Sequence, residues 1–257
     1  MPRYDFRTPR LFVEAALEAA ARVEIDHAQA NYLVNVLRLR AYDAVLLFNG
    51  RDGEWRARLV PGKRRATLLV EVQARPQTAP ADLHYAFAPL KHARLDYLVQ
   101  KAVEMGVSRL QPVLTRHTQA ARVNEARMGA NAVEAAQQCG ILTLPEIAPP
   151  VSFDRFLAER GEDRLLVFCD EDAEVADPVA ALAARSGPGG RPLPLALIVG
   201  PEGGFVDEER TALLGLRNVV RIALGPRILR ADTAAVAALA LVQAVLGDWR
   251  RSPQGGH

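Results

Sequence analysis

The residues best suited to chemistry gather in two glycine-containing segments of the C-terminal third. The first is LALIVGPEGGF, in which an apolar run leads directly into Gly200-Pro201-Glu202-Gly203-Gly204. Glycine at the end of a strand lets a ligand approach the backbone closely, and ligands of open α/β sheets bind at that edge. The alternative is an ordinary turn before a helix. Three glycines, a proline and a carboxylate in five residues argue against that alternative.

The second segment is LGPRILRADTAA, residues 224–235, which follows the same plan. Arg227 and Arg230 lie in its loop, and Asp232 and Thr233 are candidate N-caps for the helix that follows. An arginine at a glycine-lined sheet edge could stabilise negative charge on a reacting group. The alternative for Arg230 is a salt bridge to a nearby carboxylate such as Glu202.

Several other functional classes are excluded. Neither the dinucleotide fingerprint G-x-G-x-x-G nor the phosphate loop G-x-x-x-x-G-K-[ST] occurs. Cys139 and Cys169 have no His or Cys partners at ligand spacing, so we expect free buried thiols and no metal site. The N-terminus lacks the apolar run of a signal peptide, and the longest apolar tract, residues 234–246, is too short to span a bilayer. We expect a soluble cytoplasmic protein.

The charge is unevenly distributed along the 257 residues. Lys and Arg number 32 against 30 Asp and Glu, so the net charge is only +2. Residues 1–75 nevertheless contain 13 basic and 9 acidic side chains, a net charge of +4. Positive charge at one end of a chain indicates a polyanionic partner there.

The hydrophobic pattern divides the chain into two domains. Residues 1–75 predict a helix over 26–37 and strands over 44–48, 54–60 and 66–72, which together indicate a small β-barrel. Residues 76–82 are proline-containing and polar and predict a linker. Strands and helices alternate over 83–250, which predicts an α/β domain with a mainly parallel sheet. We expect residues 251–257 to form a disordered tail.

The two glycine segments, GPEGGF and LGPRILRADTA, resemble the ribosomal RNA small subunit methyltransferase E family. Further motifs agree with it along the chain: His27, Val36, Leu37 and Arg38 in an early motif, and Lys91, Arg94, Gln100, Lys101, Glu104, Gly106 and Val107 in a later one. The resemblance covers about residues 5–248 and keeps the motif order. The chain departs from the family pattern at Gln137, Ile141 and Asp232, where the family has Glu, Arg and, more commonly, Glu.

The resemblance implies a fold, a cofactor and partners. The C-terminal domain would be a SPOUT methyltransferase with a trefoil knot, and the N-terminal domain a PUA-like barrel that binds RNA. The protein would be a homodimer that binds S-adenosylmethionine and 16S ribosomal RNA of the small ribosomal subunit. The implied cofactor-binding residues are Val199, Gly200, Pro201, Glu202, Gly203, Gly204, Leu224, Gly225, Ile228, Leu229, Thr233 and Ala234. The candidate RNA-binding residues are His27, Arg38, Arg40, Arg7, Arg10, Lys91 and Arg94.

The implied reaction moves a methyl group from S-adenosylmethionine to N3 of a uridine, uracil 1498 in the family. Arg230 would stabilise the charge that develops on the uracil carbonyls, and Glu202 would act either as a base or in ordering its loop. Two alternatives stay open. One is a related SPOUT enzyme that methylates transfer RNA or a ribose 2′-OH. The other is a non-catalytic ribosome-assembly factor that retains the fold.

Overall fold

The computed structural model describes residues 5, 7–60, 62, 66–119, 122–174, 177–187 and 193–250, without the side chain of His92. The tail expected over 251–257 lies outside these residues. The chain divides into two compact units, Met1–Ala79 with Val133–Leu144 and Pro80–Ala132 with Pro145–His257. Residues 133–144, which the sequence analysis leaves in the α/β domain, therefore pack with the first unit.

The first unit contains a five-stranded sheet in the order β1-β3-β4-β5-β2. Its strands are β1 Arg10–Phe12, β2 Arg22–Glu24, β3 Ala44–Phe48, β4 Glu54–Val60 and β5 Thr67–Arg75. β1 pairs with β3 in parallel, and the other pairs are antiparallel. The sheet packs on a core that includes Leu33, Val45, Leu47, Leu68 and Val70. The three predicted strands are confirmed, whereas closure into a barrel stays a prediction.

A short helical segment follows β2 in this unit. Asp26 caps helix α1, His27–Asn31, by accepting the Gln29 backbone N–H at 2.7 Å, while the Gln29 side chain reaches back to the Asp26 N–H. Such a capping box satisfies backbone donors that the first turn leaves free. The helix continues as a π-helix, η1, over Tyr32–Val36. The helix predicted over 26–37 is therefore present, and its second half is a π-helix.

The end of helix α3, Glu125–Cys139, also belongs to this unit. Gln137 Oε1 accepts the Phe12 backbone N–H at 2.9 Å, and the Arg75 guanidinium donates to the Gly140 carbonyl at 2.9 Å. Gln137 is one of the departures from the family pattern. Its side chain oxygen here holds the backbone of strand β1.

The second unit is built on a parallel sheet in the order β12-β10-β11-β6-β7-β8, with β9 pairing β7. The strands are β6 Leu83–Phe87, β7 Arg109–Leu114, β8 Glu146–Ile147, β9 Val151–Ser152, β10 Leu165–Cys169, β11 Leu195–Val199 and β12 Val219–Ile222. The pairings are parallel throughout. The predicted parallel α/β sheet is confirmed, and the carboxyl ends of its strands share one edge.

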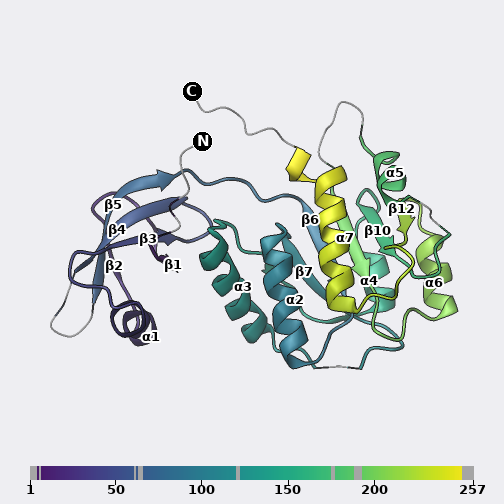
Figure 1. The fold of residues 1–257 in the computed structure, drawn as a ribbon, viewed down its shortest axis with the longest axis horizontal. Helices are drawn as coiled ribbons and strands as arrows, with labels where there is room; N and C mark the ends of the chain where they lie inside the picture. The colour runs from purple at the N-terminus through teal and green to yellow at the C-terminus, as the bar shows by residue number, and fades with distance from the viewer. Residues whose placement is uncertain are drawn as a thin grey trace. The chain divides into compact units, whose positions relative to one another are not determined.

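Helices cover both faces of this sheet. Helices α2, His92–Glu104, and α7, Ala231–Val245, contact each other on one face (Figure 1). On the other face, Phe153 and Phe156 of α4, Phe153–Glu159, and Leu213 of α6, Asp207–Leu214, pack on Ala196 and Ile198. Helix α5, Pro178–Ala183, contacts α7, and a 3-10 turn, η3, covers Asp248–Arg250. No helix of the described residues is long and apolar enough to cross a membrane.

Candidate functional site

The two glycine segments form loops at the carboxyl edge of the parallel sheet. The first loop, residues 200–206, connects β11 to α6, and the second, residues 223–230, connects β12 to α7. At Gly200 a Cβ atom would lie 2.7 Å from the Phe205 ring, and Gly204 has a φ of +68°. The first loop therefore depends on glycine for both space and backbone conformation.

The second loop leaves its backbone open. Gly225 has a φ of +92°, and a Cβ atom there would meet nothing within 4 Å. Within the described residues, the backbone N–H groups of Gly225, Arg227, Ile228 and Leu229 have no hydrogen-bond acceptor. The Ile228 side chain is 100% exposed. The loop thus presents backbone donors and an apolar side chain to whatever binds at this edge.

Arg94 of helix α2 joins the two loops. Its Nη1 atom donates to Glu202 Oε1 of the first loop at 2.7 Å. Its Nε and Nη2 atoms donate to the two carboxylate oxygens of Asp232, at the start of α7, at 3.2 and 3.4 Å. We call this three-residue group the Arg94 clasp. It links the start of α7, which follows the second glycine loop, to Glu202 in the first glycine loop.

The Arg94 clasp shifts the pKa values of Asp232 and Arg94. The hydrogen bond from Arg94 lowers the pKa of Asp232, with a further contribution from the Thr233 backbone N–H. The same bond to Asp232, with the charges of Asp232 and Glu202, raises the pKa of Arg94. Each charged form is therefore stabilised by its partner.

A second set of contacts holds the loop after β7 to the first glycine loop. His117 Nδ1 lies 2.9 Å from the Gly203 carbonyl oxygen and donates to it, because a carbonyl can only accept. The Glu209 carboxylate accepts the backbone N–H of Arg116 at 2.8 Å and that of Val206 at 3.2 Å. Neither His117 nor Glu209 stood out in the sequence as a site residue. Their role depends on strand order, which brings β7 and β11 to either side of β6.

Arg230 occupies the N-cap position of α7. The predicted capping by Asp232 and Thr233 is wrong, because the helix begins at Ala231 and the Asp232 carboxylate binds Arg94 instead. The Arg230 side chain is exposed and pairs with no carboxylate of the described residues. Glu202, the partner considered for Arg230, pairs with Arg94.

The remaining predicted cofactor residues differ in exposure. Val199, Pro201 and Ala234 are buried beneath the loops, whereas Leu224 and Leu229 are partly buried and Thr233 is exposed. The predicted cofactor residues therefore lie at the end of β11, in the two loops and at the start of α7.

The predicted RNA-binding residues divide into three groups. Arg7, His27, Arg38, Arg40 and Lys91 are exposed. Arg10 is 7% exposed, and its Nε atom donates to the buried Glu54 at 2.8 Å, so its guanidinium faces the interior. The expectation that Arg10 contacts RNA is corrected on this ground. Arg94 belongs to the Arg94 clasp.

A buried carboxylate near the loops was missed by the sequence analysis. The Asp170 side chain, directly after β10, is fully buried and pairs with Arg210 at 2.7 Å and Arg221 at 2.6 Å. The run Cys169-Asp170-Glu171-Asp172 after an apolar strand was the available signal. Two arginines from distant segments neutralise Asp170, which could not be paired from the sequence alone.

The free thiols differ from the prediction in one respect. Cys169 is buried as expected, and burial raises the pKa of its thiol, but Cys139 at the end of α3 is exposed. Among the described residues, no three His, Cys, Asp or Glu side chains are grouped to hold a metal ion.

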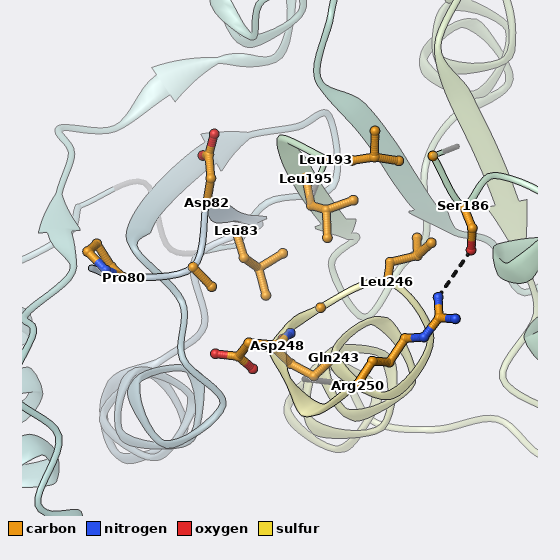
Figure 2. A pocket seen from close by; sticks show the side chains of 13 residues that line it. Pro80, Asp82, Leu83, Ser186, Leu193, Leu195, Gln243, Leu246, Asp248 and Arg250 are labelled. Atoms are coloured by element: carbon orange, nitrogen blue, oxygen red, sulfur yellow. Dashed lines mark hydrogen bonds between the residues drawn. The ribbon is translucent and has the colours of Figure 1, made fainter. Parts of the chain in front are cut away.

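A pocket of about 340 Å³ lies at the opposite edge of the sheet. Figure 2 shows Leu83 and Leu195, the first residues of β6 and β11, facing Leu246 after α7, with the hydrogen bond from Arg250 to Ser186 at one side. The glycine loops follow the other ends of these strands. The pocket is therefore separate from the candidate site.

Comparison with known proteins defines the class. The family model described as RNA methyltransferase domain matches residues 77–243, and the model described as RNA methyltransferase PUA domain matches residues 25–71. The parallel sheet and its glycine loops are thus those of an RNA methyltransferase. The chain belongs to the ribosomal RNA small subunit methyltransferase E family.

Individual relatives agree along nearly the whole chain. Ribosomal RNA small subunit methyltransferase E of Rickettsia conorii is 30% identical over 237 residues, which cover 91% of this chain and 94% of the relative. The protein of that name from Neisseria gonorrhoeae, bound to S-adenosyl methionine, has a TM-score of 0.80 at 25% identity, covering 95% of this chain and all of that one. A Legionella pneumophila protein in complex with the cofactor SAM has a TM-score of 0.81 at 29% identity, covering 94% and 99%.

Proposed function

We propose that the protein methylates N3 of one uridine in 16S ribosomal RNA, uracil 1498 in the numbering used for the family, with S-adenosylmethionine as methyl donor. The observation that carries the proposal is the Arg94 clasp. It brings together, in one cluster, the α2 motif and the two glycine loops on which the family resemblance rests. Similar proteins of known structure hold this cofactor.

The residues present suit the cofactor. The loop 223–230 offers backbone N–H groups with no acceptor among the described residues, next to the apolar Ile228. Glu202 and Asp232 add negative charge at the same edge, which complements a cationic sulfonium. When bound there, S-adenosylmethionine would supply an electrophilic methyl group. We propose that residues 199–204, together with Leu224, Gly225, Ile228, Leu229, Thr233 and Ala234, hold it.

The protein's own residues would then act on the uridine. Arg230 is exposed at the start of α7 and pairs with no carboxylate of the described residues, so its guanidinium is available to the uracil carbonyl oxygens. Loss of the N3 proton puts negative charge on those oxygens, and a fixed cation stabilises it. Glu202 already accepts a hydrogen bond from Arg94, which favours its role in ordering the loop over that of base.

The N-terminal unit would bind the RNA backbone. Arg7, Arg38 and Arg40 are exposed there, and the net charge of residues 1–75 is +4. Cations of this kind position the RNA without reading its sequence.

We further propose that the sheet of this unit closes as a PUA-like barrel, that the chain after β11 forms a trefoil knot, and that the enzyme works in the cytoplasm as a homodimer. Val236, Leu241 and Val245 of α7 are only partly buried within one chain, which supports a partner on that helix.

Nucleoside analysis tests the proposed reaction. In a strain that lacks this gene, mass spectrometry of digested 16S ribosomal RNA should show the loss of 3-methyluridine, and the wild-type gene should restore it. Loss of a transfer RNA nucleoside or of a 2′-O-methyl nucleoside would support the related SPOUT enzymes instead. An unchanged nucleoside profile, together with no heat of binding on titration with S-adenosylmethionine, would support the assembly factor.

A further inference from the structure

The turn that joins the π-helix to strand β3 has an unusual backbone. Within residues 37–43, which we call the 37–43 turn, Arg38 has a φ of +57° and Tyr42 a φ of +70°. This left-handed region favours glycine, and a bulky aromatic residue there is a conformational outlier. Such outliers persist where the surrounding structure fixes them, and they concentrate at functional sites.

Hydrogen bonds to strand β4 fix the backbone of Tyr42 on both sides. Its N–H donates to the Leu59 carbonyl at 2.7 Å, and its carbonyl accepts from Arg58 Nη1 at 3.1 Å. The Arg40 N–H donates to Asp43 Oδ2 at 2.7 Å and closes the turn. The turn would keep this shape with glycine at position 42, because every one of these bonds at Tyr42 uses backbone atoms of that residue.

Leu37 and Leu39 of the turn pack against the core, whereas the side chains of Arg38, Arg40 and Tyr42 are exposed to solvent. Tyr42 is 64% exposed and Val36, just before the turn, is 60% exposed. Arg38 and Arg40 are exposed and have no side-chain partner among the described residues, whereas Arg58 pairs with Glu71 at 2.8 Å. The exposed Tyr42 ring therefore buries little surface that would offset the free-energy cost of its left-handed backbone conformation.

We propose that the Tyr42 ring is a stacking platform for an unpaired base of the RNA substrate, with Arg38 and Arg40 binding the adjacent phosphates. The proposal rests on the proposed function and adds a binding site for one base and its neighbouring phosphates on the N-terminal unit. Residues two apart span at most about 7 Å, so the two cations and the ring lie within reach of neighbouring nucleotides. Proteins bind single-stranded RNA by combining cations along its backbone with aromatic rings under its bases.

The strain provides a test with two opposite effects. Tyr42→Gly removes the steric cost of the positive φ and should raise the midpoint of thermal unfolding by about 2–4 °C. The same variant should weaken binding of a fluorescent, uridine-containing single-stranded RNA about 5- to 100-fold, the usual loss for one stacked base. Tyr42→Phe keeps the ring and should bind this RNA within about twofold of the wild type.

Ala20 provides the matched control, because it lies in the same unit with a φ of +66° and has no ring. Ala20→Gly should also raise the unfolding midpoint and should leave RNA affinity unchanged. A duplex RNA of equal length, whose bases are already stacked, should lose little affinity in any of these variants.

Three outcomes would overturn the proposal. In the first, Tyr42→Gly is more stable yet binds the single-stranded RNA as tightly as the wild type. In the second, the duplex RNA loses as much affinity as the single strand. In the third, Tyr42→Gly weakens binding of a ribosomal protein but not of RNA. Failure of the wild-type protein to methylate the small subunit at all would contradict the proposed function and not the stacking role.

Discussion

The Arg94 Nη1 atom lies 2.7 Å from Glu202 Oε1, so an arginine of α2 holds a loop that follows it by more than a hundred residues. The same guanidinium holds Asp232 at the start of α7. One side chain therefore sets the spacing between the two loops that we propose bind the cofactor. The sequence analysis gave Arg94 as a candidate RNA-binding residue, and in the structure its guanidinium pairs with these two carboxylates.

We expect Arg94→Ala to lower the single-turnover methyl-transfer rate and the affinity for S-adenosylmethionine each by tenfold or more, because both loops lose their common anchor. Global stability should fall by less than about 1 kcal/mol, since all three side chains are partly exposed to solvent. Single-turnover kinetics, calorimetric titration and urea unfolding measure the three quantities.

Arg127 serves as the control for Arg94. It pairs with Asp96 of α2 at 2.5 Å in the same unit, and its hydrogen bonds among the described residues go to Asn124 and Asp96 and to neither glycine loop. Arg127→Ala should leave the rate and cofactor affinity unchanged. If Arg94→Ala behaves like Arg127→Ala, the clasp does not set the geometry of the loops.

Arg230→Ala should lower the methyl-transfer rate by about 10²–10³-fold while it changes cofactor affinity by less than about threefold. The reason is that a cation aimed at the uracil carbonyls meets more negative charge in the transition state than in the ground state. Arg230→Lys should recover only part of the rate, because an ammonium group lacks the planar fork. A normal single-turnover rate with weakened cofactor binding would instead assign Arg230 to the cofactor site.

The sheet and its loops could be predicted because each strand carries its own local signal. The apolar runs at 165–169 and 195–199 match β10 and β11 residue for residue, and the glycines that follow β11 mark the sheet edge. Gly106, which follows the C-cap residue Met105 of α2, has a φ of +77°, a conformation that favours glycine at the end of a helix. These features depend on neighbouring residues only.

The contacts of the site could not be predicted, because they join distant segments. Arg94 and Arg230 are both arginines in family motifs, and the sequence does not show which of them pairs with Glu202. The packing of α2 beside α7 decides it. Burial of Arg10 depends similarly on Glu54, across the first sheet. A sequence shows the charge of each residue but not which partner neutralises it.

Gly200→Ala should destabilise the protein by about 1–3 kcal/mol, because the added Cβ would lie 2.7 Å from the Phe205 ring, which is itself packed edge-on against Phe168. Cofactor affinity should fall with it as the first loop shifts. Urea unfolding measures the change. Gly129→Ala, in helix α3 with no atom within 4 Å of the new Cβ, should stabilise by about 0.5–1 kcal/mol. Equal stability of the Gly200→Ala variant would show that the ring moves aside freely.

His84 on β6 should make stability depend on pH. Burial, with the positive charge of Arg164, lowers its pKa to about 4 from the usual 6.5, despite Asp82 at 3.6 Å. The unfolded chain therefore binds a proton between pH 6.5 and 4 that the folded protein excludes. The stabilisation is complete above pH 6.5 and is lost as the pH falls toward 4. The side chain is 31% exposed, so we expect a loss on the order of 1–2 kcal/mol after allowing for solvent screening.

The measurement is urea unfolding of the wild type and of His84→Gln at pH 7 and pH 4.5. The variant has no imidazole to protonate, so the difference in unfolding free energy between the two pH values should be smaller than in the wild type by that amount. Carboxylates elsewhere titrate in both proteins and cancel in the comparison. If the two proteins lose the same stability between pH 7 and pH 4.5, His84 is not held neutral by its surroundings, and the electrostatic influence of Arg164 on this strand is weaker than its position indicates.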